Sequence, residues 1–243
     1  MPGSRRRKPS RPRRWVWWLA GGAAAVIVLA VGGTFLYIHV ISGPAPAPLS
    51  LKPSSGPSST APAGESAATS VAGTWKITNG SVVGYRVNEV LLGQNTTAVG
   101  RSSDVTGHLT VTGSTAASTV TAATFSVPMD TIHSDKSQRD AQFDGRIMNV
   151  SEYPTGTFTL TAPITLKGDS EESYTAHGNL TLHGATKAVT FPLQAELKNG
   201  QIELLGDIPV LFSDYNIANP SFAGFVTTQN HGILEFLLIL KQG

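Results

Sequence analysis

The stretch that decides the fold class is Val189-Thr190-Phe191-Pro192-Leu193-Gln194-Ala195-Glu196-Leu197. Apolar side chains occupy every second position of it, and polar residues or proline stand between them. Successive side chains of a β-strand point to opposite faces, so this alternation predicts a strand with one buried face and one solvent-facing face.

The same two-residue period recurs on both sides of this stretch. Asn199-Gly200 separates it from the next alternating run and is typical of a tight hairpin turn. The last run, 233–240, is apolar on both faces apart from Glu235, which predicts a strand packed on both sides. Further alternating runs are 105–111, 179–183 and 202–212.

One segment departs from the β pattern. Within 135–150, apolar residues recur at three- and four-residue steps from Phe143 to Val150, which predicts a short helix with Ser134 or Asp135 as its N-cap. About eight strands, one helix and no regular alternation of the two predict an all-β fold in which an antiparallel sheet closes into a barrel. A β-sandwich is the alternative that periodicity leaves open.

The N-terminal part of the chain has a different character. Residues 1–14 carry seven basic residues and no acid, and 15–41 contain no Asp, Glu, Lys or Arg. As a helix the second segment is about 40 Å long, which exceeds a hydrocarbon core of about 30 Å. We therefore expect a single-pass transmembrane helix in the cell membrane, with the basic tail cytoplasmic and the following domain extracytoplasmic. A cleaved signal peptide is the alternative, but its apolar region is normally shorter.

A linker and a single domain follow the predicted anchor. Residues 42–72 are rich in Pro, Ser and Ala, which predicts a disordered tether, and the barrel domain is expected over 73–243. Without the basic tail, eleven basic residues face sixteen acidic ones, and this balance argues against a nucleic-acid partner. The chain has no cysteine, which excludes disulfides and thiolate chemistry.

Two groups of residues in the domain resemble a known family. One segment of the YceI-like family is similar to Gly178-Asn179-Leu180-Thr181-Leu182-His183-Gly184-Ala185-Thr186-Lys187. A second segment of the same family resembles Arg139-Asp140 together with Tyr153-Pro154 and Thr157-Phe158. The resemblance implies a lipocalin-like barrel that binds a polyisoprenoid or a similar amphiphilic lipid. The chain departs from the family at Tyr85-Arg86-Val87-Asn88, so the family's histidine there is not carried over.

If the barrel holds such a lipid, its inward-facing apolar residues must line the chain, although each of them is equally explained as ordinary core filling. A polar or phosphate head group would remain at the barrel mouth near basic residues. For Arg139 the alternative is a helix-surface ion pair with Asp140, and for Lys187 it is a solvated turn. The expected lining residues are Phe125, Phe158, Phe191, Phe212, Phe236, Leu180 and Leu182, and the expected head-group residues are Arg139, Lys187, Arg86 and His183.

Other function classes have little support in the sequence. The histidines form no closely spaced pair, and no Gly-x-Ser-x-Gly elbow or phosphate-binding loop is present, so we expect no metal, no cofactor and no enzymatic activity. The competing hypothesis is a structural or interaction module with a packed barrel and an envelope protein as partner. Its candidate surface is loop 213–231, which contains Tyr215, Phe222 and Phe225.

Overall fold

The computed structural model describes Val26, 44–51, 71–114, 117–166, 172–222, Gly224 and 226–243. The chain forms two compact units, Met1–Pro44 and Ala45–Gly243, and the second contains the whole sheet. The predicted anchor, apart from Val26, and most of the predicted linker lie outside the described residues. Within the described part, no helix is both long and apolar enough to cross a membrane.

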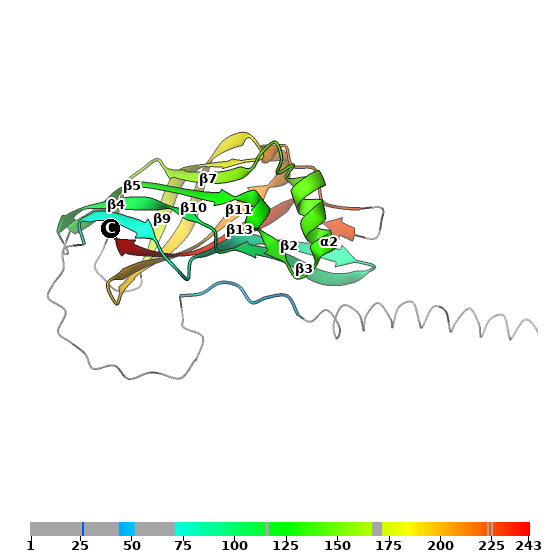
Figure 1. The fold of residues 1–243 in the computed structure, drawn as a ribbon, viewed down its shortest axis with the longest axis horizontal. Helices are drawn as coiled ribbons and strands as arrows, with labels where there is room; N and C mark the ends of the chain where they lie inside the picture. The colour runs from blue at the N-terminus through cyan, green and yellow to red at the C-terminus, as the bar shows by residue number, and fades with distance from the viewer. Residues whose placement is uncertain are drawn as a thin grey trace, which may run out of the picture. The chain divides into compact units, whose positions relative to one another are not determined.

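The second unit is built on a single antiparallel sheet that closes on itself (Figure 1). The order β1-β4-β5-β7-β9-β10-β11-β13 returns to its start through the pairing of β1 with β13, which makes a ring of eight strands. The predicted antiparallel barrel is therefore confirmed and the sandwich is excluded. The strands of the ring are β1 (Gly73–Ile77), β4 (Thr106–Ser114), β5 (Ala117–Pro128), β7 (Thr155–Leu160), β9 (Glu172–Leu182), β10 (Ala185–Lys198), β11 (Gln201–Leu211) and β13 (His231–Gln242).

Five further strands extend this ring at its margins. β2 adds to β13 and β3 pairs with β2, so the sheet continues past the closure point. Their bounds are β2 (Val82–Leu91), β3 (Gln94–Ser102), β6 (His133–Ser134), β8 (Ile164–Thr165) and β12 (Val226–Thr228).

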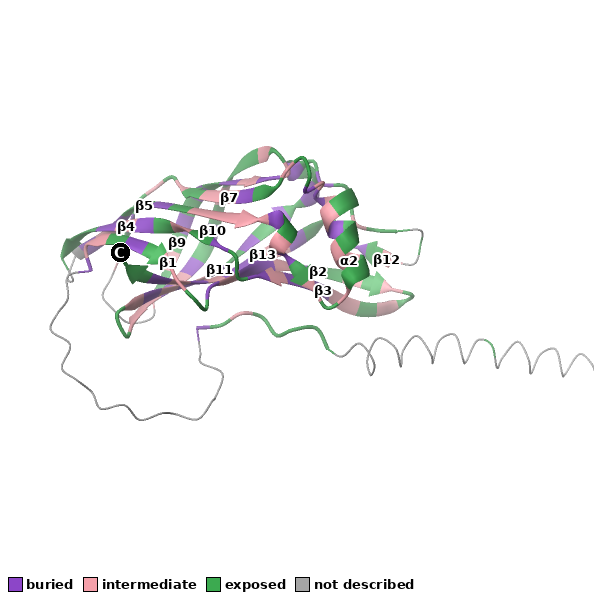
Figure 2. Ribbon diagram, in the orientation of Figure 1, coloured by how far each residue is buried: buried purple, intermediate pink, exposed green. Residues whose placement is uncertain are grey.

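Burial follows the alternation predicted from the sequence (Figure 2). In β10, Phe191, Leu193 and Ala195 are buried on the inner face. The predicted hairpin turn between β10 and β11 is also confirmed, because Asn199 and Gly200 have φ values of 52° and 72° and connect the paired residues Lys198 and Gln201.

β13 is not buried on both faces as predicted. Its inner face, including Phe236, Leu238 and Leu240, belongs to the core, whereas outward-facing Ile233 and Leu237 are only partly buried. The outer wall of the barrel is thus partly accessible along this strand.

The predicted helix 135–150 is shorter than expected. The α-helix α2 covers Ser137–Gln142, and a wider π-helical turn, η3 (Phe143–Ile147), continues it. The N-cap is Lys136 rather than Ser134 or Asp135, because Ser134 belongs to β6 and its hydroxyl donates a hydrogen bond to Asp140 instead.

Candidate functional site

The inner wall of the barrel brings together six of the seven predicted lining residues. Phe125 pairs with Phe158, and Phe158 pairs with Leu180, so these three side chains form a row across β5, β7 and β9. Leu182, Phe191 and Phe236 belong to the same hydrophobic core. The rings of Phe158 and Phe191 lie 5.6 Å apart, and those of Phe191 and Phe236 lie 5.9 Å apart, which gives a continuous aromatic lining.

Several of these rings lie against glycines of neighbouring strands. A Cβ atom at Gly178 would lie 2.2 Å from Phe158 Cε2, and one at Gly206 would lie 2.5 Å from Phe236 Cζ. Phe125 occupies the space over Gly107 in the same way. A ring that fills the place of a missing side chain lies close to the backbone of the wall. These rings therefore lie against the backbone of the inner wall.

Phe212 does not lie in a strand, contrary to the prediction. β11 ends at Leu211, and Phe212 starts the 3₁₀ turn η4 (Phe212–Tyr215), which ends at Asn216 in a left-handed conformation. Phe212 remains buried in the core, because the turn folds back onto the end of the barrel.

β10 and β11 separate toward the end of the barrel that carries η4. They pair from Leu193 and Gly206 up to their hairpin, and no pairing between them is present beyond those residues in the described chain. Pro192 and Pro209 lie in the separated parts, where neither can donate a backbone hydrogen bond. This seam is therefore a break in the ring at one end.

Tyr215 is buried at this end of the barrel, with 2% of its surface exposed. Its hydroxyl has no hydrogen-bond partner among the described residues, and burial, with a smaller effect of Asp214, raises the pKa of the phenol to about 12. The phenol is therefore a neutral donor at ordinary pH. His183 Nδ1 lies 3.1 Å from the Tyr215 carbonyl oxygen and donates to it, while the His183 ring packs 4.4 Å from that of Tyr153.

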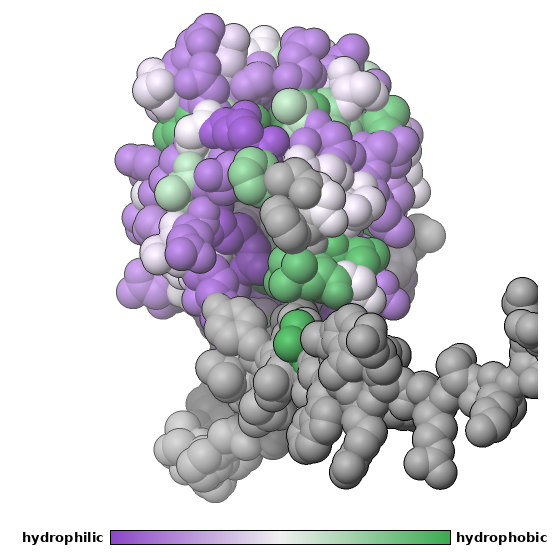
Figure 3. Space-filling view, turned by 90° about the vertical axis from the view of Figure 1, so that its right-hand side faces the viewer, coloured by the Kyte–Doolittle hydropathy of each residue, from purple (hydrophilic) through white to green (hydrophobic). Residues whose placement is uncertain are grey.

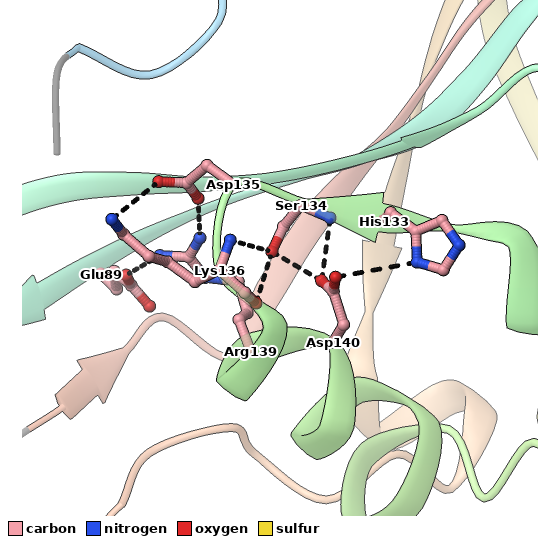
Figure 4. A network of polar contacts seen from close by, with 7 residues as sticks. All are labelled: Glu89, His133, Ser134, Asp135, Lys136, Arg139 and Asp140. Carbon is pink, nitrogen blue, oxygen red and sulfur yellow. Dashed lines mark hydrogen bonds and ion pairs between the residues drawn. The ribbon is translucent and has the colours of Figure 1, made fainter.

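A polar network surrounds the start of α2 (Figure 4). Arg139 donates to Glu89 of β2 at 3.3 Å and to Asp135, and Asp140 accepts hydrogen bonds from the backbone N–H and hydroxyl of Ser134 at 2.8 and 2.6 Å. Burial acts to lower the pKa of Arg139, but Glu89 and Asp135 outweigh it, so the pKa is raised. The positive charge of Arg139 is thus already compensated within the protein.

Tyr85 connects this network to the inner wall. Its ring stacks on that of Phe143 with centroids 5.1 Å apart, and it occupies the space over Gly100. Burial raises the pKa of its phenol, while Arg139 works in the opposite direction. α2 and η3 are therefore fixed to β2 by an aromatic stack as well as by the ion pair of Arg139 with Glu89.

The expected head-group residues do not form one cluster. Arg86 was expected at the mouth, but it lies on the outer wall, where its Nε is 3.1 Å from Glu235. The reason is the two-residue period, since the preceding Tyr85 faces inward. Lys187 is exposed on the separated part of β10, and His183 fastens η4.

Sequence reasoning missed two features of this region. Tyr215 was assigned to a loop, and the pairing of Glu235 with Arg101 as well as Arg86 was not foreseen. Glu235 did carry a signal, because it is the only charged residue in the otherwise apolar run 233–240. Among the described residues, no group of three His, Asp or Glu side chains is arranged as a metal site.

Comparisons with known proteins agree with this architecture. The family model described as the YceI-like domain matches residues 75–237. A polyisoprenoid binding domain from Saccharophagus degradans, implicated in plant cell wall breakdown, has a similar fold, with a TM-score of 0.55 and 13% identity over 71% of this chain and 99% of that one. BcnA of Burkholderia cenocepacia gives a TM-score of 0.50 and 19% identity over 64% of this chain and 95% of its own. No curated protein matches the sequence.

Proposed function

The chain belongs to the YceI-like family, and from this premise we propose that its barrel binds an amphiphilic lipid, with an apolar chain of the polyisoprenoid type held in the interior. The observation that carries the proposal is the aromatic lining that lies against glycines of the wall. Rings placed in this way present apolar surface to the interior and lie close to the backbone of the wall. The Saccharophagus degradans domain of similar fold is described as polyisoprenoid binding, which supports the same ligand class.

The polar end of the ligand belongs at the end of the barrel that carries α2 and η4. There the hydroxyl of Tyr215 is buried without a protein partner and is available as a donor. A buried donor that stays unpaired costs about 1–3 kcal/mol, so a ligand oxygen that accepts its hydrogen bond recovers part of this cost. Arg139 offers less, because two carboxylates already hold its guanidinium.

The proposed role is non-covalent sequestration or transport next to a membrane. Residues 15–41 are proposed to anchor the chain with residues 1–14 in the cytoplasm and the barrel on the extracytoplasmic side. This part of the proposal is supported by the charge asymmetry and length of the N-terminal sequence. Catalysis is not part of the proposed function.

Native mass spectrometry of the detergent-solubilised full chain tests the lipid proposal. A long-chain prenyl quinone and a prenyl phosphate of equal chain length are the probes, and a saturated phospholipid is the reference. We expect a one-to-one complex with the prenyl probes that survives mild activation. A chain that takes up none of the prenyl probes, or takes up all three lipids equally, would contradict the proposal.

A second candidate function is an interaction module of the cell envelope. Phe222 is 57% exposed and is contacted from one side by the guanidinium of Arg146, whose Cζ lies 5.8 Å from the ring centroid. Figure 3 shows further hydrophobic surface on this end of the barrel, and Phe225 lies outside the described residues. If Phe222→Ser abolishes crosslinking to a defined envelope protein and leaves prenyl-lipid uptake unchanged, recruitment is the better account of this surface.

A further inference from the structure

The outer wall of the barrel holds a short segment that precedes the domain. Arg86 Nη2 donates to the carbonyl oxygen of Pro46 at 2.9 Å, and Arg101 Nη2 donates to that of Ala47. Residues 45–51 belong to the same compact unit as the barrel. Part of the predicted linker is therefore fastened to the wall, which corrects the expectation that all of 42–72 is a loose tether.

Glu235 organises the two arginines that hold this segment. It faces outward from β13, yet only 2% of its side chain is exposed. Its carboxylate accepts from Arg86 Nε at 3.1 Å and from Arg101 Nε at 2.8 Å. Each guanidinium thus contacts the buried carboxylate and the segment together, and the ion pair with Glu235 restricts its orientation.

Gly84 makes room for this arrangement. The ladder places it directly between Glu235 of β13 and Arg101 of β3. A Cβ atom at position 84 would lie 2.9 Å from Arg101 Cγ and 2.1 Å from the Gly100 carbonyl oxygen. The glycine allows the Arg101 side chain to cross β2 and reach Glu235.

The backbone of the segment is suited to accept hydrogen bonds from side-chain donors. Its sequence begins Ala45-Pro46-Ala47-Pro48, so every second residue lacks a backbone N–H, and each alanine is extended because a proline follows it. Such a backbone presents carbonyl oxygens that its own chain does not satisfy. Two fixed guanidinium groups supply the missing donors.

Apolar burial accompanies these polar contacts. Leu51 and Val99 are 7% and 5% exposed, but neither belongs to the core inside the barrel. Val99 pairs with Arg86 in the ladder and therefore points to the same outer side. Val99 is thus buried on the outside of the wall, and Leu51, at the end of the segment, is buried outside the core as well.

We propose that Arg86, Arg101 and Glu235 form a binding site for an extended proline-rich segment, and that residues 45–48 of this chain are its occupant. With residues 45–48 in the site, the linker is divided into residues 42–44 on the N-terminal side and residues 49–72 on the C-terminal side. If residues 15–41 are an anchor, which rests on the proposed function, three residues of the sequence, 42–44, separate the anchor from the site. Three residues span at most about 10 Å, whereas the whole linker as a random coil would reach about 30 Å.

Spin labelling of the full chain tests the site, because the protein has no cysteine and a single one can be introduced. A nitroxide at Ala45→Cys should give an immobilised spectrum in the otherwise unchanged protein. In Arg86→Gln/Arg101→Gln/Glu235→Gln, which removes the three charges together, the correlation time should shorten about tenfold, toward that of a flexible loop. Arg146→Gln, which changes an arginine of η3 instead, is the matched control and should leave the spectrum unchanged.

A second variant changes the segment and leaves the barrel intact. Pro46→Gly/Pro48→Gly should mobilise the label without changing the melting temperature of the barrel. A label that is already mobile in the parent, or that stays immobilised in both variants, would overturn the proposal. Membrane fractionation of the same chain reports on the anchor separately, so a soluble chain with an immobilised label would refute the anchor and leave the site standing.

Discussion

The ring of Phe158 occupies the place that a side chain at position 178 would fill. A Cβ atom at Gly178 would come within 2.2 Å of Phe158 Cε2 and 2.7 Å of the Thr159 carbonyl oxygen. Because one neighbour is backbone, the wall has little freedom to relax. The position of the Phe158 ring on β7 therefore depends on the absence of a side chain at Gly178 of the adjacent strand β9.

Replacing this glycine should therefore both destabilise the barrel and change its interior. Gly178→Ala should cost about 1–3 kcal/mol of unfolding free energy, since overpacking forces the ring or the backbone to move. The displaced ring should also weaken prenyl-lipid uptake. Urea unfolding and native mass spectrometry measure the two effects. Gly145→Ala is the control, because no atom lies within 4 Å of its added Cβ, and equal losses in both variants would count against the packing argument.

The turn between β2 and β3 has an unfavourable residue at its tip. Leu92 has a φ of 50° and is 52% exposed, although a branched apolar residue rarely adopts this conformation. Leu92→Asn should raise the unfolding free energy by up to about 1 kcal/mol, because asparagine tolerates positive φ better. The reverse change at the opposite end, Asn199→Leu with a φ of 52°, should lower it by a similar amount. Thermal melting of both variants decides the matter, and a drop in melting temperature for Leu92→Asn would be inconsistent with backbone strain.

The buried phenol of Tyr215 should make the protein sensitive to alkaline pH. In the folded state burial raises its pKa to about 12, whereas in the unfolded chain it ionises near its ordinary value of about 10. The unfolded state therefore loses its proton first, and stability falls as pH rises from about 10 to 12. Tyr215→Phe should reduce this loss and should stabilise the ligand-free protein at neutral pH by about 1 kcal/mol, because it removes an unpaired hydroxyl. Urea unfolding at several pH values measures both. An unchanged pH profile in the variant would show that other groups cause the alkaline loss.

Removing one arginine from the cluster of Arg86, Arg101 and Glu235 on the outer wall should lower the unfolding free energy. Arg101→Ala leaves the carboxylate of Glu235, of which only 2% is exposed, with a single arginine, and we expect a loss of about 3 kcal/mol of unfolding free energy. The Arg101→Ala/Glu235→Gln double variant should recover part of the loss, because the uncompensated charge is gone. A double-mutant cycle in urea checks this expectation, and strictly additive losses would contradict it.

The strand pattern in the sequence was sufficient for the all-β class, whereas the choice of a barrel over a sandwich needed the pairing of β1 with β13. The two-residue period from Val189 to Leu197 and the turn at Asn199-Gly200 were both confirmed, because alternation and turn conformation depend on local residues. The helix was predicted too long, since the same apolar spacing is compatible with α2 and with the wider turn of η3. The transmembrane segment, which lies outside the described residues except for Val26, stays a prediction.

The site was harder to predict because it depends on contacts between distant residues. The inward position of Phe191 followed from the alternation of side chains along a strand. The same rule places Arg86 on the outer face if the preceding Tyr85 faces inward. Phe212 was wrongly assigned to a strand, because β11 ends at Leu211 and the turn η4 begins at Phe212. The contacts from Pro46 and Ala47 to the wall span 40 and 54 residues, and a proline-rich composition alone does not reveal them.

The central claim is that a lipid chain occupies the barrel axis, and two substitutions on neighbouring residues of β9 test it most directly. Ala176 is buried on the inner face, and Thr175 is exposed on the outer face. The measurement is the affinity of each variant for a fluorescent prenyl lipid, after melting curves have shown that both are folded. Ala176→Phe should weaken binding at least about tenfold, because its ring fills the axis, while Thr175→Phe should bind like the parent. Equal affinities in all three proteins would show that the lipid does not enter the barrel.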